Sequence, residues 1–221
     1  MAATTTHHVV AIDGPAASGK SSVSRRVADQ LGFAFVSSGL MYRAFTWVAC
    51  EAGIDPAADP DAVVVLLEKT NIKPARKGNE LYILVNGKAP GSALTEDRIN
   101  AQVSNVAKIP EVRKALVALQ RACPEAADIV MEGRDVGSVV FPDTPFKLYL
   151  DASEEVRAHR RAAQGLGDEI GERDRMDSTR KVSPLKIADG AIVIDTSELT
   201  LPQVVEAVIA RLRELGLPEA S

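Results

Sequence analysis

The chain has 221 residues, of which 46% are hydrophobic, and it is long enough to bury the core of one α/β domain. Its formal net charge of −4 argues against a nucleic-acid-binding scaffold, which usually carries a basic surplus. No apolar stretch approaches the ~20 residues that span a bilayer, and the N-terminal residues lack the basic and then apolar pattern of a secretory signal, so we expect a cytoplasmic protein without a membrane partner.

The first expected element is a strand, because residues 9–21 begin with an apolar run that stops in a glycine-bounded loop. Gly14, Gly19, Lys20 and Ser21 fill all defined positions of the pattern G-x-x-x-x-G-K-[ST]. The glycines let backbone amides turn inward, and the helical pattern that follows directs its positive dipole end at an anion. We expect Lys20 to reach the β- and γ-phosphates of a nucleoside triphosphate and the Ser21 hydroxyl to bind Mg²⁺.

Residues 33–36 are all apolar and predict a second strand, after which Ser37, Ser38 and Gly39 are typical of a helix start. Serine oxygens can accept hydrogen bonds from the first amides of a helix, so we expect them to cap this one. The helix carries Arg43 near its positive end, where a cation is unfavourable unless an anion binds there. Arg43 is therefore a candidate phosphate ligand, and an arginine that points into water is the alternative.

A small antiparallel insert is expected at residues 71–94, outside the parallel sheet and after a helix at residues 59–69. Within the insert, residues 73–79 indicate a turn and residues 81–85 a strand. Asn86-Gly87 is a typical hairpin turn.

Two further helices are predicted, one opened by Thr95 as a hydroxyl cap and one by Pro110 at its first position. The buried strand at residues 127–132 then leads directly to Arg134 and Asp135. Ligands of open parallel sheets collect at the carboxyl ends of the strands, so we expect both side chains in a binding site.

Residues 145–150 predict another strand, and the helix after it places Arg157, Arg160 and Arg161 on one face by their spacing. A second helical pattern, at residues 172–180, places Arg173, Asp177 and Arg180 on one face of a helix.

A strand at residues 191–195 and a helix at residues 201–215 complete the expected elements. Five strands thus alternate with helices after a phosphate-binding loop. This order predicts a three-layer α/β fold of the P-loop type, in which helices flank a five-stranded parallel sheet and the antiparallel insert is peripheral.

A phosphate loop alone fits switches, motors, pumps and small-molecule kinases. The guanine-binding motif N-K-x-D of regulatory GTPases is absent, and the chain is too short for a motor. Two phosphate-bearing ligands would explain the many arginines, because phosphoryl transfer depends on cations along the transferring group. A phosphate acceptor needs no general base, whereas a hydroxyl acceptor needs one near Lys20, and only Asp13 is available there.

Four segments resemble the successive motifs of the bacterial cytidylate kinases: SGLMYR at residues 38–43, EGRDVG at 132–137, FPD at 141–143 and RDRMDSTR at 173–180. The resemblance covers nearly the whole chain, including the insert. It implies the nucleoside monophosphate kinase fold over a single domain, residues 1–221. Its implied parts are a core (1–38, 114–152 and 185–221), a monophosphate-binding lobe (39–113) and a lid (153–184).

The resemblance also implies the reaction, in which the γ-phosphoryl group of ATP, bound with Mg²⁺, passes to CMP or dCMP. We expect a monomer whose partners are these small molecules. The implied ATP ligands are Gly14, Pro15, Ala16, Ala17, Ser18, Gly19, Lys20, Ser21, Ser22, Arg157 and Arg161, with Ser21 as the metal ligand. The implied CMP ligands are Ser38, Arg43, Ser104, Arg113, Arg134, Asp135, Arg173, Asp177 and Arg180. The implied catalytic residues are Lys20, Arg134, Arg157 and Arg161.

Asp135 is expected to select the base. Cytosine presents an amino donor at N4 beside the acceptors N3 and O2, so Asp135 can accept from the amino group while Arg180 donates to the acceptors. Uracil presents O4 instead, and two opposed acceptors can lower its turnover by orders of magnitude. The alternative is an ion pair of Asp135 with Arg134 or Arg180 that steadies the loop, and both can hold.

Other hypotheses stay open at this stage. Residues 162–172 are fewer than the family usually has in its lid, so either the lid is truncated or residues are missing from the sequence. The function can also be that of a kinase acting on UMP or on a hydroxyl acceptor. A nucleotide-gated binding protein without turnover is a further alternative, which the number of arginines disfavours.

Overall fold

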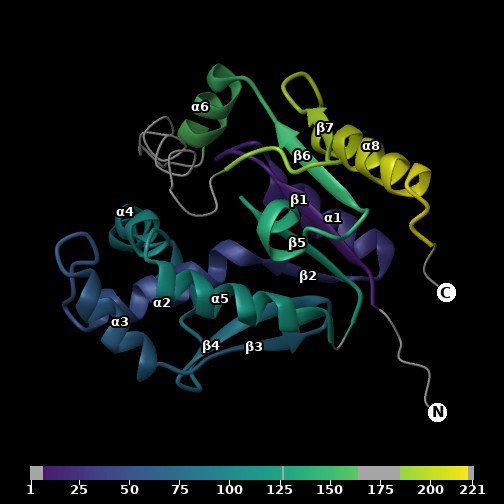
Figure 1. Cartoon of the computed structure of the whole chain (residues 1–221). Helices are drawn as coiled ribbons and strands as arrows, with labels where there is room; N and C mark the ends of the chain where they lie inside the picture. Colours follow the sequence, from purple (N-terminus) through teal and green to yellow (C-terminus); the bar gives the residue numbers. More distant parts are fainter. Residues whose placement is uncertain (1–6, 126, 164–184, 219–221) are drawn as a thin grey trace, which may run out of the picture.

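The strands of the computed structural model, which describes residues 7–125, 127–163 and 185–218, form one sheet of seven. The strand order is β3-β4-β2-β5-β1-β6-β7, and helices cover both faces (Figure 1). The predicted three-layer α/β fold is confirmed, but the expected number of five strands is wrong. Among the described helices, none is long and apolar enough to cross a membrane.

Six of the seven strands run parallel, and five of them form the expected core of the sheet: β1 (Val9–Asp13), β2 (Ala34–Ser37), β5 (Ile129–Gly133), β6 (Lys147–Asp151) and β7 (Ile192–Asp195). Asp13 lies in register with Gly133, and Ser37 lies in register with Glu132. The carboxyl ends of β1, β2 and β5 therefore meet at one edge of the sheet.

The core has two parts, one on each face of the sheet. Val10 and Ile12 pack on the face covered by α1 (Lys20–Leu31) and α8 (Leu201–Glu214), whereas Ala11 packs on the opposite face. Successive residues of a strand point to opposite faces, so β1 is apolar from Val9 to Ile12 because both of its faces are buried. The opposite face is covered by α2 (Ser38–Glu51), α4 (Asp97–Val106) and α5 (Pro110–Ala122).

The insert belongs to the same sheet, which corrects the expectation that it lies outside. Strand β3 (Ile72–Lys77) pairs antiparallel with β4 (Glu80–Val85), and β4 continues the sheet by pairing parallel with β2. Residues 73–79, expected as a turn, are therefore mostly strand. Pro74 and the charges of β3 are compatible with this position, because the outer side of an edge strand needs no partner.

The predicted Asn86-Gly87 turn is present, but a different turn joins β3 to β4. Lys77 pairs with Glu80, so the turn is Gly78-Asn79. Asn86 and Gly87 form the next turn, which Val85 and Lys88 close as an isolated antiparallel bridge.

Three helices, α2, α3 (Pro60–Glu68) and α5, start where the sequence predicts, but the predicted caps of α2 and α4 are not formed. Pro110 opens α5, and the Asp59 carboxylate caps α3 by accepting from the Ala62 amide at 3.0 Å. Ser37 precedes α2 but donates its hydroxyl to Glu132, and Thr95 donates to the Ser92 carbonyl, so neither makes the predicted cap. The remaining elements among the described residues are 3-10 turns at Gly91–Thr95 (η1) and Cys123–Glu125 (η2), a π-helical turn at Val136–Val140 (η3) and helix α6 at Glu154–Ala163.

Candidate functional site

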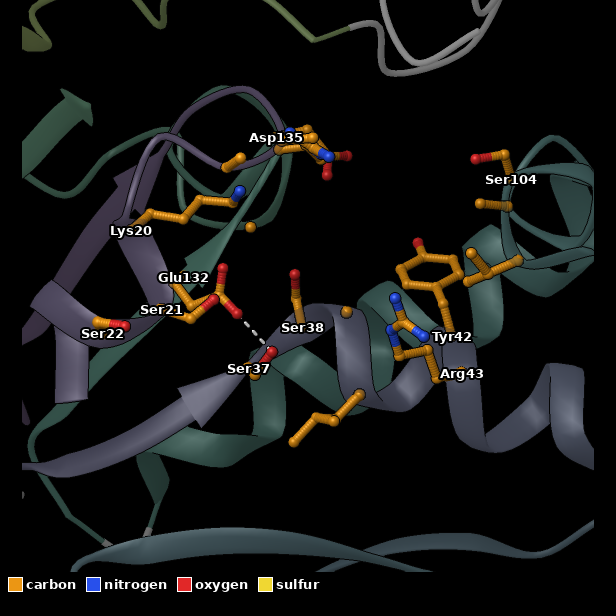
Figure 2. A pocket seen from close by; sticks show the side chains of 18 of the residues that line it. Lys20, Ser21, Ser22, Ser37, Ser38, Tyr42, Arg43, Ser104, Glu132 and Asp135 are labelled. Atoms are coloured by element: carbon orange, nitrogen blue, oxygen red, sulfur yellow. Dashed lines mark hydrogen bonds between the residues drawn. The ribbon is translucent and has the colours of Figure 1, made fainter. Parts of the chain in front are cut away.

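A cleft of about 360 Å³ opens at the carboxyl ends of β1, β2 and β5. Lys20, Asp135 and Glu132 lie on one side of the open space, and Tyr42, Arg43 and Ser104 lie on the other (Figure 2). The predicted site residues that line the cleft are Ala16, Ala17, Gly19, Lys20, Ser21, Ser22, Ser38, Arg43, Ser104, Arg113, Arg134, Asp135 and Arg161. Gly14, Pro15, Ser18 and Arg157 are not part of this lining, and Arg173, Asp177 and Arg180 lie outside the described residues.

The loop after β1 has the geometry of an anion cradle. A Cβ atom at Gly14 would overlap the carbonyl oxygen of Leu150, so the close approach of the two backbones requires glycine. Gly19 adopts a left-handed conformation, with φ of 88°, directly before the first turn of α1. The Lys20 ammonium donates to the Pro15 carbonyl at 2.9 Å and therefore stands over the loop, where phosphates would bind.

Ser21 follows Lys20 in the first turn of α1, and its side chain is exposed at the cleft. A Mg²⁺ ion bound with a triphosphate takes most of its oxygens from phosphates and waters, so a single protein hydroxyl suits it. Within the described residues, no group of three or more His, Cys, Asp or Glu side chains could hold a metal on its own. The Ser21 hydroxyl fits a divalent metal that takes its other oxygens from a nucleotide and from water.

Arg113 of α5 forms a buried ion pair with Asp135, which follows β5. A second amino group of Arg113 donates to the Ala107 carbonyl at 3.3 Å, and the guanidinium carbon lies 5.6 Å from the centre of the Tyr42 ring. The sequence had suggested Arg134 or Arg180 as the partner of Asp135. Arg180 lies outside the described residues, so its pairing with Asp135 stays a prediction. Arg134 donates to the Gly14 carbonyl at 2.7 Å and so contacts the phosphate loop.

The far wall of the cleft comes from α2 and α4. Ser38 and Ser104 are nearly buried, and Figure 2 shows the Ser104 hydroxyl directed into the open space. Arg43 donates to the Leu94 carbonyl at 2.9 Å, which orders its guanidinium at the rim. This wall offers hydroxyl and guanidinium donors about a small, partly apolar space, to which Val103 contributes.

The three arginines of α6 have different targets although their spacing places them on one face. Arg157 donates to the carbonyls of Ala152 and Ala16, at 3.1 and 3.4 Å, and so contacts the phosphate loop. Arg160 donates to the hydroxyl and the carbonyl of Thr196, at 3.0 and 2.7 Å, at the end of β7. Arg161 lines the cleft.

Ser37 and Glu132 were not predicted as site residues. The Ser37 hydroxyl donates to the Glu132 carboxylate at 2.5 Å across the cleft floor (Figure 2). The signal that could have found them is their position, because each stands at the carboxyl end of an expected parallel strand.

Arg25 of α1 also lines the cleft and was not predicted. Its guanidinium stacks 4.5 Å above the Phe35 ring and forms an ion pair with Glu80 at the start of β4. No sequence signal linked these three residues, because they come from separate elements.

Asp13 is the acid that the sequence offered as a base for a hydroxyl acceptor. Its carboxylate oxygens accept the amide hydrogens of Val136 and Gly137, both at 2.8 Å. Burial raises the pKa of Asp13 to about 7, opposed by those two hydrogen bonds. Because both oxygens are bound by backbone amides, the geometry does not favour Asp13 as the base for a substrate hydroxyl.

Comparison with known proteins gives a consistent result. The family model described as cytidylate kinase matches residues 10–214. A cytidylate kinase of Mycobacterium avium is 44% identical over 210 residues, which are 90% of this chain and 92% of that protein. A cytidylate kinase of Streptomyces avermitilis is 40% identical over 215 residues, 93% of each chain.

A longer relative is also similar to this chain. It is the bifunctional pantoate ligase/cytidylate kinase of Synechococcus elongatus, 40% identical over 229 residues. The alignment covers 96% of this chain but 43% of that protein, so the chain spans less than half of the longer relative's length.

Proposed function

Because the chain belongs to the cytidylate kinase family, we propose that it transfers the γ-phosphoryl group of ATP to CMP or dCMP, giving ADP and CDP or dCDP. The observation that carries the proposal is the buried Asp135 carboxylate in the same cleft as the phosphate loop. One end of the cleft suits a triphosphate, and the other suits a base with an amino donor.

The ATP ligands in this proposal are the phosphate loop, residues 14–22, and the α6 arginines Arg157 and Arg161. Lys20 would leave the Pro15 carbonyl for the β- and γ-phosphates. Catalysis of phosphoryl transfer is mostly positioning and charge stabilisation, so Lys20, Arg134, Arg157 and Arg161 would act as cations around the transferring group.

The CMP ligands are proposed on the opposite side of the cleft. Arg43, Arg113 and Arg134 would hold the phosphate, and Ser38, Ser104 and Asp135 would hold the cytosine. The residues proposed beyond the described part of the chain are Arg173 and Asp177 for the ribose and Arg180 for the base.

We also propose the division into core, monophosphate-binding lobe and lid at the boundaries given above. The nucleotide-bound metal is proposed to be Mg²⁺, with Ser21 as its protein ligand, and it would neutralise charge on the β- and γ-phosphates. The proposed working form is a cytoplasmic monomer with ATP and CMP as its partners.

A coupled assay of ADP release tests the proposal. CMP, dCMP, UMP, AMP and shikimate are compared as acceptors at fixed ATP and Mg²⁺. We expect kcat/KM for CMP or dCMP to exceed that for every other acceptor by at least ~10²-fold. Equal turnover of UMP or shikimate would contradict the assignment, and ATP binding without transfer to any acceptor would favour a binding protein.

A further inference from the structure

Asp13 is the last residue of β1 and is only 3% exposed. One of its carboxylate oxygens accepts the Val136 amide hydrogen and the other accepts that of Gly137, each at 2.8 Å. Both donors follow directly after Asp135 in the chain. Asp13 thus binds the backbone that carries the proposed base-selecting residue, without contacting the cleft itself.

A third hydrogen bond joins the same two segments. Arg134 donates to the Gly14 carbonyl at 2.7 Å, so two consecutive residues at the end of β1 contact the segment 134–137. The segment continues β5, whose Gly133 lies in register with Asp13. The start of the phosphate loop and the segment that carries Asp135 therefore form one connected unit.

The acceptors at this position need to be two neighbouring oxygens that carry no hydrogen. An ionised carboxylate, the form that Asp13 takes above its pKa of about 7, meets that need, whereas an asparagine amide would direct its own N–H groups at one of the backbone donors. The charged groups that act on the Asp13 carboxylate are Lys20 of the phosphate loop and Asp135 of the segment it binds. On β6, Tyr149 lies in register beside Asp13.

We propose that Asp13 is a positioning residue, which fixes the segment 134–137 to the phosphate loop and so sets the distance from Asp135 and Arg134 to Lys20. The inference rests on the proposed function, because in-line transfer requires the acceptor phosphate at a defined distance from the donor. A displacement of about 1 Å can lower the rate ~10²-fold. Asp13 does not touch either substrate in this role.

The test is a comparison of Asp13→Asn and Asp13→Ser with Asp128→Asn as a matched control. Asp128 precedes β5 at the opposite edge of the sheet, where its carboxylate accepts the His8 amide at 2.5 Å. For each variant, KM is measured for CMP and for ATP, together with the ratio of kcat/KM between CMP and UMP. Serine is smaller than aspartate, so the Asp13→Ser variant is used for the test if the Asp13→Asn variant does not fold.

We expect the Asp13 variants to raise KM for CMP about 10-fold or more and to lower the CMP to UMP ratio, with KM for ATP changed less than 3-fold. Asp128→Asn should leave all three quantities within 2-fold of the wild type. Equal effects on both substrates, or an unchanged KM for CMP, would overturn the positioning role. If the wild type does not phosphorylate CMP, the proposed function fails instead.

Amide hydrogen exchange tests the contact itself without substrate. In the nucleotide-free wild type, we expect Val136 and Gly137 to be protected, and either Asp13 variant to lower that protection about 10-fold or more. Val139 and Val140, whose amides donate to the Asp135 carbonyl, serve as internal references. Exchange of Val136 and Gly137 at unprotected rates in the wild type would refute the inference.

Discussion

The guanidinium of Arg113 contacts the carboxylate of Asp135, although 22 positions separate the two residues in the chain. Both side chains are buried in the wall of the cleft. A buried pair tolerates the loss of one partner poorly, because the other charge is left without compensation, at about 3–5 kcal/mol. In our proposal the pair also holds the Asp135 carboxylate ready to accept the cytosine amino group.

Asp135→Ala should therefore change both selectivity and stability. We expect the ratio of kcat/KM between CMP and UMP to fall about 10- to 100-fold, which corresponds to one good base contact. The free energy of unfolding should fall by about 3–5 kcal/mol. Competition assays and urea titration measure the two effects.

The double variant Asp135→Ala with Arg113→Met separates these effects. Removing both charges should restore most of the stability, because no buried charge is left unpaired, while the selectivity stays low. A CMP to UMP preference that survives in either variant would contradict the assigned role of Asp135.

Lys20→Ala should lower kcat for transfer by about 10²–10³-fold or more, because it removes a cation from the transferring phosphates. The fold should persist, since the Lys20 side chain is only half-buried and donates to a loop carbonyl, that of Pro15. Single-turnover kinetics measure the step, and Lys114→Ala, at an exposed position of α5, is the control. Transfer at wild-type rate without Lys20 would exclude the loop as the γ-phosphate site.

Gly14→Ala should destabilise the protein by about 1–3 kcal/mol, because the added Cβ overlaps the Leu150 carbonyl and forces the loop to shift. Thermal unfolding would then shift down by about 5 °C for a chain of this size. Gly39→Ala is the matched control, since its added Cβ would lie 3.7 Å from the nearest atom, the Ser37 hydroxyl. A Gly14 variant as stable as the Gly39 variant would argue against the close packing.

The raised pKa of Asp13, about 7 against the usual 3.8, makes a prediction for stability as a function of pH. Between these values the native state binds more protons than the unfolded state, so the free energy of unfolding falls as pH rises. The contribution is complete below about pH 4 and is lost by about pH 7, with an upper size of about 4 kcal/mol at 1.4 kcal/mol per unit. Urea titrations at pH 5 and pH 8 should show Asp13→Asn gaining stability relative to the wild type at the higher pH. If the difference in free energy of unfolding between wild type and variant does not depend on pH, the pKa of Asp13 is not raised.

The sequence predicted the parallel core well because its signals are local. Apolar runs such as residues 9–12, a motif with fixed spacing, and Pro110 at a helix start need no distant partner to be interpreted. The insert was misassigned because its strands form through pairing with adjacent strands rather than from a local sequence pattern. β3 carries Pro74 and several charges that suggest a turn in isolation, and only pairing with β4 makes it a strand.

The site was predictable in composition but not in its internal contacts. Motif positions indicated which residues gather at the cleft, and 13 of them line it. Three contacts join residues that are far apart in the chain: Arg113 with Asp135, Ser37 with Glu132, and Asp13 with the Val136 amide. Such contacts depend on how strands and helices are packed, which residue spacing does not determine.

A crystal structure with CMP and a non-hydrolysable ATP analogue tests the central claim most directly. We predict that the cytosine amino group lies within hydrogen-bond distance of the Asp135 carboxylate, that Arg43, Arg113 and Arg134 contact the CMP phosphate, and that the γ-phosphate lies over residues 14–21. CMP bound elsewhere, or bound in the cleft with those arginines directed into solvent, would contradict the account.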